Sequence, residues 1–406
     1  MANNFKNTSL VTKIAVKEFL NAMVLGQKVD RQLDDQFQKV GASIQVRRPV
    51  MFEATDGATL TTASDIEERS ATVTLDQRKK VHFEITSQDM TLNVAEMTER
   101  YIKPCMVELA QKVEMAIAEV YVNIGNFTGT AGTSPSTLLA VAQAGAVLTK
   151  LGVEKSNRCL AVDADASVTL ANGLKDVFPD SIAKKAIEEA MVGRYGSWDI
   201  LESNSLAVHT VGALGGTPLV NGASQDTTYL LSGDNWTQTL NVDGWTASIA
   251  DILKAGDVFT IAGVNSVNRR TRKTTGALQT FTVTADASSN GSGETALTIS
   301  PPVIASGAFQ TVASAPADGA ALTILTGAAG SEHVQNLGFH KNAITLAMAP
   351  LDTPTDGASA SEQRYGGISI RSVRQFDIVS DKTIFRFDIL FGVKAQNPDF
   401  ALRLTS

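Results

Sequence analysis

The longest periodic segment constrains the fold most, because it predicts a helix too long for one small domain. Residues 91–124 carry apolar side chains at steps of three and four, the spacing that places them on one helix face. At about 1.5 Å per residue, such a helix spans on the order of 50 Å. Pro104 removes one helical hydrogen bond and should kink or divide the rod. We therefore expect a spine helix against which other segments pack.

An N-terminal helix is predicted before the spine. Residues 8–29 carry a loose apolar stripe, and Thr8 or Ser9 can cap the helix that this stripe predicts. The segment is either an ordinary surface helix or an arm that docks on a neighbouring subunit, because an apolar helix face needs a partner.

Between these two helices the sequence predicts a long hairpin. Apolar and polar residues alternate in 71–86, with a charged break at 77–80, which predicts a strand with one wet face. An earlier strand, 44–52, is separated from it by the polar segment 53–68. A two-stranded hairpin is marginally stable in water, so this one should lie against another surface.

Beyond the spine, helix and strand patterns alternate, which is typical of an α/β layer. Helices are predicted over 138–151 and 181–192, and short strands over 158–162, 199–201 and 206–210.

From Val211 the composition shifts to Thr, Val, Gly and Asn. Short strands separated by Gly or Asn predict a small inserted β-barrel or sandwich. The clearest of these strands are expected at 258–261, 280–284 and 296–299. The α/β pattern returns at 337–349, and terminal strands are expected at 368–379 and 383–395.

The composition excludes several classes of protein. The net charge is −7, whereas proteins that grip nucleic acid carry a basic excess. Mild acidity suits a container for DNA, since strong attraction to the cargo would hinder packing and release. Cys105 and Cys159 are too few and too far apart for a disulfide scaffold, and we expect two buried thiols. The sequence has no signal peptide and no apolar run of membrane-spanning length, which predicts a protein made and used in the cytoplasm.

No arrangement of residues points to catalysis. The nucleophile-elbow, zinc-protease, Cys-x-x-Cys and phosphate-loop motifs are missing from the sequence. His333 and His340 are seven residues apart and would share a helix face only loosely, and His82 falls on the polar face of a strand. Asp163 and Asp165 are expected to cap or turn before a helix, because the Gly and terminal Glu of a calcium loop are absent. We expect no enzyme activity, no metal and no cofactor.

Two basic clusters are the candidate contact residues. They lie on the hairpin strand and in the β insertion, at Arg47, Arg48, Arg269, Arg270, Arg272 and Lys273. The insertion cluster is flanked by Val-Asn and Thr-Thr-Gly, without the interleaved aromatic residues or the recognition helix that nucleic-acid readout uses. The insertion cluster is a solvated loop or an electrostatic contact to an acidic patch on another subunit, with nucleic acid as the third reading. The inter-subunit contact is the hypothesis for all six residues.

Two local motifs resemble a known family. The run Asn336–Leu351 resembles the Asn-Leu-x-Phe-His-x-x-Ala-x-x-Leu-Ala-x-x-Pro-Leu pattern of short-tailed-phage coat proteins. Lys254–Val264, with Leu297–Pro302, is similar to the inserted β-barrel of the same group. The order of arm helix, hairpin, spine helix, α/β domain, β insertion and terminal strands looks like the Hong Kong 97 fold of tailed-phage major capsid proteins.

The resemblance implies an α+β fold whose parts have names and boundaries. These are an N-terminal arm (1–35), an extended hairpin loop (36–90), a peripheral domain with the spine helix (91–137), an axial domain in two parts (138–215 and 329–367), an inserted β-barrel (216–328) and C-terminal strands (368–406).

The resemblance also implies partners and a location. The chain would assemble into pentamers and hexamers of an icosahedral head, with a scaffolding protein and a portal during assembly. Packaged double-stranded DNA would be contacted non-specifically, no membrane would be involved, and the head would be built in the host cytoplasm and end as part of the virion. We expect a shell without covalent cross-links, in which the hairpin lies on the neighbouring subunit.

Two other classes stay open at this point. The first is an encapsulin-like cellular compartment with the same fold, which would hold a cargo enzyme instead of DNA. The second is an enzyme or adhesin with a β-sandwich module, against which the missing catalytic set and secretion signal count.

Overall fold

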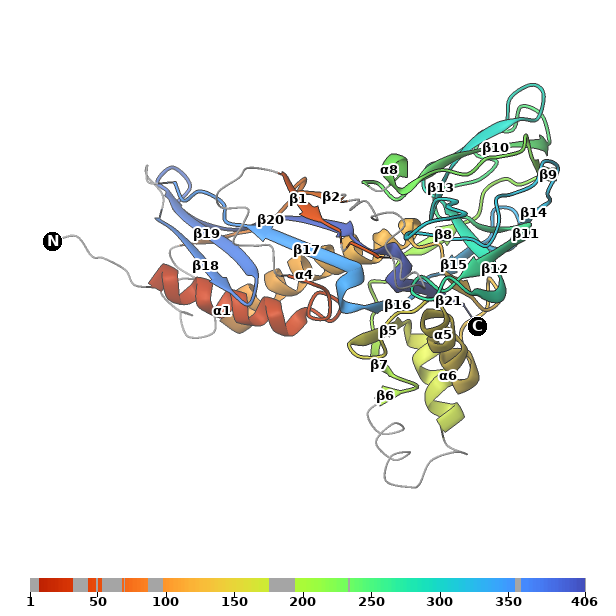
Figure 1. The fold of residues 1–406 in the computed structure, drawn as a ribbon. Coiled ribbons are helices and arrows are strands. Elements are labelled where there is room, and N and C mark those ends of the chain that lie inside the picture. The colour runs from red at the N-terminus through yellow and green to blue at the C-terminus, as the bar shows by residue number, and fades with distance from the viewer. Residues whose placement is uncertain are drawn as a thin grey trace, which may run out of the picture. The chain divides into compact units, whose positions relative to one another are not determined.

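The computed structural model describes residues 7–31, 43–48, 50–52, 68, 70–86, 98–174, 194–232, 234–354 and 359–405. These residues form a mixed α and β structure that divides into two compact units (Figure 1). Unit 1 contains Met1–Gln45, Thr72–Ile117 and Thr345–Lys394, and unit 2 contains Val46–Ala71, Ala118–Ile344 and Ala395–Ser406.

Unit 1 is built on an antiparallel sheet whose longest strand is β20 (Lys382–Ala395). Strand β3 (Gln77–Thr86) pairs with it from Lys382↔Thr86 to Phe391↔Gln77. The sheet is completed by β17 (Ile344–Ala349), β18 (Ser359–Tyr365) and β19 (Ile368–Asp377). The expected charged break at 77–80 is therefore wrong: these residues begin β3, and Arg78 and Lys80 are on its exposed face.

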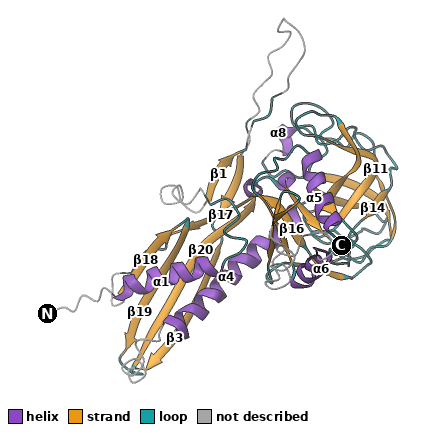
Figure 2. Ribbon diagram, turned by 90° about the horizontal axis from the view of Figure 1, so that it is seen from below, coloured by secondary structure: helices purple, strands orange, loops and turns teal. Residues whose placement is uncertain are grey.

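Helices α1 (Asn7–Ala22) and α4 (Lys103–Ala118) cover one face of this sheet (Figure 2). Helix α1 contacts β18 and β19, and Thr12 Oγ1 lies 2.7 Å from Ser372 Oγ of β19. The rings of Phe83 in β3 and Tyr101 stack at 5.6 Å on the same face.

The predicted spine helix has three parts. A π-helical turn, η2 (Thr98–Ile102), leads into α4 (Lys103–Ala118), and a 3-10 turn, η3 (Glu119–Asn123), follows. The change from π to α geometry occurs next to Pro104, where the missing N–H is tolerated in a first helical turn. The helix type thus changes next to Pro104 while the chain stays helical from Thr98 to Asn123, and residues 91–97 of the predicted helix lie outside the described residues.

Helix α1 differs from its prediction at both ends. It already includes Asn7, so Thr8 and Ser9 do not precede it as caps, and it ends at Ala22 instead of residue 29. The early end has a physical cause. The amides of Val24, Leu25 and Gly26 donate to the carboxylate of Glu114 in α4, at 3.1, 2.8 and 2.9 Å, and so leave the helical pattern.

The hairpin of the sequence analysis is present at its root. Strand β1 (Ser43–Arg47) pairs with β2 (Ser70–Thr74), as predicted. The intervening residues 53–67 lie outside the described residues.

Unit 2 contains a mixed sheet with two helices against it. Helix α5 (Leu138–Lys150) contacts both β21 and β4 of this sheet, and it contacts α6 (Ala164–Leu174). The strands follow the order β4 (Phe127–Thr128), β21 (Ala401–Leu404), β16 (Asn336–His340), β5 (Arg158–Val162), β7 (Trp198–Glu202) and β6 (Arg194–Tyr195).

The predictions for this layer were confirmed in most places. Helix 138–151 and strands 158–162 and 199–201 correspond to α5, β5 and β7. The predicted helix over 181–192 lies outside the described residues. The returning segment 337–349 is extended, since it forms β16 and β17 around a short 3-10 turn, η4 (Lys341–Ala343).

The insertion begins and ends at a pair of adjacent strands. Strand β8 (Val208–Thr210) pairs with β15 (Glu332–Val334), and His209 is directly opposite His333. Between them lies a six-stranded sheet with the order β14 (Leu322–Ile324), β11 (Val258–Val267), β12 (Thr274–Val283), β13 (Thr295–Ser300), β10 (Gln238–Trp245) and β9 (Gly216–Val220).

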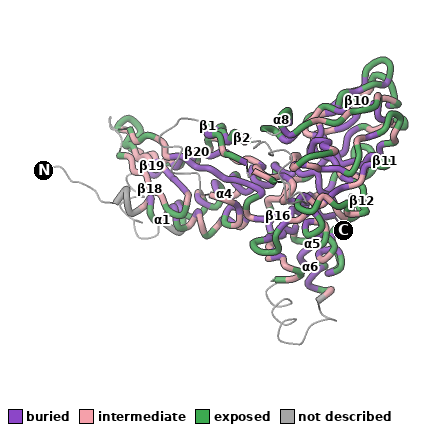
Figure 3. Tube along the Cα trace, in the orientation of Figure 1, coloured by how far each residue is buried: buried purple, intermediate pink, exposed green. Residues whose placement is uncertain are grey.

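This six-stranded sheet is a nearly closed barrel. Its edge strands β9 and β14 approach each other, and Val220 N donates to Ala320 O at 2.9 Å. Apolar residues fill the inside, among them the fully buried Phe259, Phe281 and Leu297. A short helix, α8 (Tyr229–Ser232), lies between β9 and β10, and another 3-10 turn, η5 (Pro398–Phe400), precedes β21. Figure 3 shows buried stretches along the strands and exposed residues at many of the turns.

Candidate functional site

The two arginines on the hairpin strand have different surroundings. The Arg47 side chain is 82% exposed and lies 3.5 Å from the Glu68 carboxylate. Arg48 is 8% exposed, and its guanidinium lies over the Trp236 ring at 5.6 Å. Burial lowers the pKa of Arg48, while Tyr229 and Asp399 act in the opposite direction. Arg48 is the first residue after β1, so the chain leaves the strand at the point where a buried arginine follows an exposed one.

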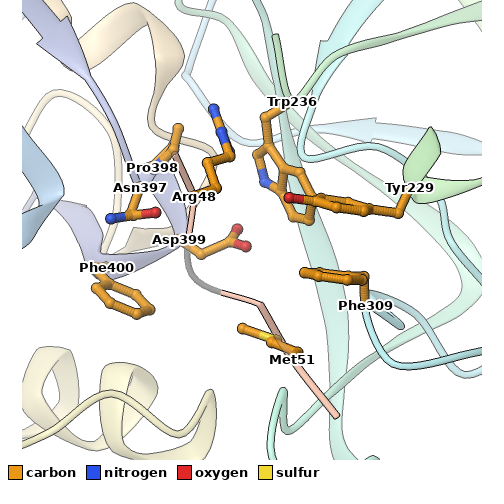
Figure 4. A pocket seen from close by; sticks show the side chains of 9 residues that line it. All are labelled: Arg48, Met51, Tyr229, Trp236, Phe309, Asn397, Pro398, Asp399 and Phe400. Carbon is orange, nitrogen blue, oxygen red and sulfur yellow. The ribbon is translucent and has the colours of Figure 1, made fainter. Parts of the chain in front are cut away.

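Arg48 sits in a small pocket (Figure 4). The Tyr229 and Phe309 rings stack at 3.5 Å with an angle of 5° between their planes. Met51 packs against the same aromatic cluster, and Asn397–Phe400 line the other side. The cavity is about 70 Å³. Pockets that bind small molecules are usually about 300–1,000 Å³, so this pocket suits a side chain better than a ligand.

The basic residues of the insertion lie in the tight turn between β11 and β12. Asn268 N donates to Lys273 O at 2.9 Å, and Asn268 Oδ1 accepts from the amides of Arg270 and Thr271 at 2.9 and 3.0 Å. Arg272 has a φ of 55°. These bonds give the turn a defined shape, because an Asn side chain at its start replaces a backbone turn acceptor.

The side chains of this turn point to different partners within unit 2. Arg269 is 6% exposed and donates to Asp399 Oδ1 at 3.4 Å and Gln310 O at 3.3 Å. Arg270 is exposed and donates to Glu154 at 3.2 Å. Arg272 Nη2 donates to the carbonyl oxygen of Phe52, just beyond Arg48, at 3.0 Å. Lys273 is exposed.

The six predicted contact residues therefore do not form one surface. Arg48 and Arg269 are buried against residues of their own subunit, whereas Arg47, Arg270 and Lys273 are open to solvent. The inter-subunit role of these residues stays a prediction.

Sequence reasoning missed a buried polar network at the junction of barrel and α/β layer. Arg403 of β21 is fully buried and donates to Gly256 O at 2.6 Å, Gln335 Oε1 at 3.4 Å and Thr282 Oγ1 at 3.3 Å. Burial lowers the pKa of Arg403 to about 10, with Tyr121 and Asp257 acting in the opposite direction. The guanidinium is still charged at neutral pH and ties β21 to the barrel.

Asp257 is the acidic centre of the same junction. Its carboxylate accepts from His209 Nε2 at 2.9 Å, Thr326 Oγ1 at 2.8 Å, Lys254 N at 2.7 Å and Gly212 N at 3.1 Å. Burial acts to raise the pKa of Asp257, but these hydrogen bonds, led by that from His209, lower it below its usual value. The sequence offered one indication that Asp257 matters, which is its position inside the Lys254–Val264 motif.

The histidines and cysteines have structural surroundings. His209 and His333 meet edge to face at 5.7 Å, and burial, His209 and Arg403 lower the pKa of His333. His340 Nδ1 accepts from Asn342 N, and His82 is exposed. The prediction of two buried thiols is right for Cys159 but wrong for Cys105, which is half-buried in α4.

The other chemical predictions can be checked only within the described residues. Asp163 Oδ1 accepts from Ala166 N at 3.2 Å, so it caps α6 as expected, whereas Asp165 does not precede the helix but lies in its first turn. Across these residues, no three His, Cys, Asp or Glu side chains are grouped in a way that could hold a metal ion. No helix in the described part of the chain is long and apolar enough to cross a membrane.

The comparisons with known proteins point to one family. The family model described as P22 coat protein, gene protein 5, matches residues 1–404. No curated protein matches the sequence.

Several solved structures contain chains similar to this one. A chain of Mycobacterium phage Che8 is 15% identical with a TM-score of 0.47, over 94% of this chain and 90% of that one. The capsid of Cyanophage P-SCSP1u is 13% identical with a TM-score of 0.45, over 94% and 88%. The CUS-3 coat protein I-domain is 31% identical with a TM-score of 0.20, over 29% of this chain and 100% of that one.

Proposed function

The chain belongs to the P22 coat protein family, and from this premise we propose that it assembles with copies of itself into the pentamers and hexamers of an icosahedral phage head that encloses double-stranded DNA. The observation that carries the proposal is the family match across residues 1–404, which covers both units and the insertion. This is a family of structural coat proteins, and the fold is the mixed α and β type that the sequence analysis expected.

The surface chemistry fits a container. The net charge of −7 limits attraction to packaged DNA, so contacts with the nucleic acid are few and non-specific. The exposed cations Arg47, Arg270 and Lys273 are the candidates for ion pairs with neighbouring subunits, although Arg47 and Arg270 already lie near Glu68 and Glu154 of their own chain. Such exposed charges set specificity and association rate more than affinity.

The proposal includes the predicted division of labour along the chain. The arm (1–35) and the hairpin loop (36–90) reach over neighbouring subunits, and the barrel (216–328) is an added module. A scaffolding protein and a portal take part in assembly in the host cytoplasm. The finished shell is held by non-covalent contacts.

Electron microscopy of the purified protein, alone and with its co-expressed phage proteins, tests the proposal. Closed shells of uniform diameter that contain DNA when isolated from infected cells are the expected result. Shells that hold a cargo enzyme and no DNA would favour the encapsulin-like alternative. A monomer under every assembly condition, measured by light scattering, would contradict both.

A further inference from the structure

We propose that the inserted barrel is a clamp that fixes the root of the hairpin within its own subunit. The root consists of an outgoing leg, formed by Arg48 and residues 50–52, and a returning leg that begins at Ser70. The proposal rests on the proposed function, because it gives the hairpin a role in shell assembly.

The outgoing leg is held at three points. The Arg48 guanidinium lies 5.6 Å from the Trp236 ring centroid. The Met51 side chain packs against the cluster formed by Tyr229, Trp236, Ile304 and Phe309. The Phe52 carbonyl oxygen accepts a hydrogen bond from Arg272 Nη2 at 3.0 Å. A cation over an aromatic face, an apolar contact and a charged hydrogen bond thus act on consecutive parts of one leg.

The returning leg is held by the same module. Ser70 N donates to the Asp234 carboxylate at 3.3 Å, and Asp234 lies two residues before Trp236. The segment 229–236 therefore contacts both legs, one through an aromatic ring and the other through a carboxylate.

The clamp is itself fixed to the α/β layer of unit 2. Asn268 Nδ2 donates to Lys150 O at 2.7 Å, and Arg269 N donates to Leu151 O at 3.2 Å, which attaches the basic turn to the end of α5. The Arg269 side chain pairs with Asp399, which lines the Arg48 pocket (Figure 4). The barrel can restrain the hairpin only if the barrel itself is fixed, and these bonds fix its basic turn to the α/β layer.

The physical benefit is preorganisation. A two-stranded hairpin is marginally stable by itself, so a free one would sample many directions. Holding both legs before a neighbour arrives removes part of the entropy that docking would otherwise cost. The clamp also separates the roles of the basic residues. Arg48, Arg269 and Arg272 build or support the clamp. Arg270 pairs with Glu154 and takes no part in it.

Hydrogen exchange on unassembled subunits tests the clamp directly. The variant is Arg48→Met with Arg272→Asn, because Met keeps an apolar stem in the pocket and Asn accepts the positive φ at position 272. Exchange of the amides in 44–52 and 70–74 should become about tenfold faster, as expected when contacts of this size are lost. The matched controls are Arg47→Met on the same strand and Arg270→Ala in the same turn, for which less than about a twofold change is expected.

A second readout connects the clamp to assembly. The double variant should form shells at least about tenfold more slowly by light scattering, with a mixture of diameters in micrographs. Amides of the barrel strands β10–β13 should exchange at the rate of the unchanged protein, which shows that the fold is kept; if the double variant does not fold, Arg272→Asn alone is used.

The outcomes separate the two proposals. Unchanged exchange at the root in a folded variant overturns the clamp, whatever shells are seen. Faster exchange with normal assembly also overturns it, because the restraint then has no role in the shell. Failure of the unchanged protein to form shells contradicts the proposed function, whereas the exchange result still reports on the root.

Discussion

Glu114 in unit 1 and Asp257 in unit 2 are both buried carboxylates that join segments distant in the sequence, and their surroundings differ. Glu114 accepts hydrogen bonds from the backbone amides of Val24, Leu25 and Gly26. Asp257 accepts from two backbone amides and also from His209 and Thr326. Burial raises the pKa of Glu114 despite its amide donors, whereas the pKa of Asp257 is lowered despite burial.

The difference shows which donors lower the pKa of a buried carboxylate below its ordinary value. Three peptide N–H groups do not offset the burial of Glu114, but an imidazole and a hydroxyl added to backbone donors do offset that of Asp257. The two junctions therefore depend on pH with opposite signs, and each can be weakened without the other.

Asp257→Ala should give the largest effect. The change leaves the donors of His209, Thr326, Lys254 and Gly212 without their acceptor, and removal of one partner from a buried charged network costs about 3–5 kcal/mol. Tryptophan fluorescence during urea unfolding measures it, because Trp198, Trp236 and Trp245 are all in unit 2. A loss below about 1 kcal/mol would show that the junction does not rely on this carboxylate.

Glu114→Ala should give a smaller loss, confined to unit 1. Three amides lose their acceptor, but they lie in a non-helical segment that can open to water, so about 2–3 kcal/mol is expected. Native-state hydrogen exchange of the Val24–Gly26 amides measures the local free energy of opening. If Glu114→Ala lowers the free energy of unfolding measured by tryptophan fluorescence as much as Asp257→Ala does, the two junctions are not separate.

A pH series sharpens the comparison. The raised pKa of Glu114 favours the folded state below its ordinary value of 4.5, and this contribution is lost as pH rises through the folded pKa. The lowered pKa of Asp257 stabilises the fold above its ordinary value of 3.8, and this contribution is lost as pH falls through the folded pKa. The stability difference between the unchanged protein and Glu114→Gln or Asp257→Asn should slope in opposite directions with pH. Parallel slopes would refute the assignment.

Exposed ion pairs set the lower limit of the comparison. Lys112 pairs with Glu108 in unit 1, and Arg270 pairs with Glu154 in unit 2. Lys112→Ala and Arg270→Ala should each change the free energy of unfolding by no more than about 0.5 kcal/mol, because exposed pairs are screened by solvent. A loss above about 1 kcal/mol for Arg270 would mean that the basic turn is held through this pair as well.

The sequence predicted elements wherever a local pattern decides them. The alternation in β3 and the apolar stripe of α5 are such patterns, and both elements were found. The end of α1 depends on Glu114, which lies 88 to 90 residues from the amides that it accepts from, and no local pattern contains that information. The charged residues 77–80 suggested a break because the pairing partner of β3, strand β20, lies at the other end of the chain.

The candidate site was predicted less completely for the same reason. Arg47 and Arg48 are adjacent and chemically identical, and only the distant Trp236 and Asp399 make one of them buried. Arg403 drew no attention as a single arginine near the C-terminus, although it is the fully buried centre of the junction. Tertiary contacts decide whether a charge is buried. The sequence could therefore locate the basic residues but could not tell the buried ones from the exposed ones.

The division of unit 1 into three chain segments bears on how a newly made subunit emerges from the ribosome. Strands β9 to β14 form a continuous stretch, and the pairing of β8 with β15 closes it, so we expect the barrel to fold as soon as it has been translated. Helices α1 and α4 are made earlier, but β18–β20, on which unit 1 is completed, come later. Protease treatment of chains truncated after Gln335, which include β15, should therefore spare the barrel and cut within α1 and α4. From the synthesis of α4 until β18–β20 are made, the nascent subunit carries two apolar helix faces without their sheet, and exposed apolar surface of this kind is prone to aggregate.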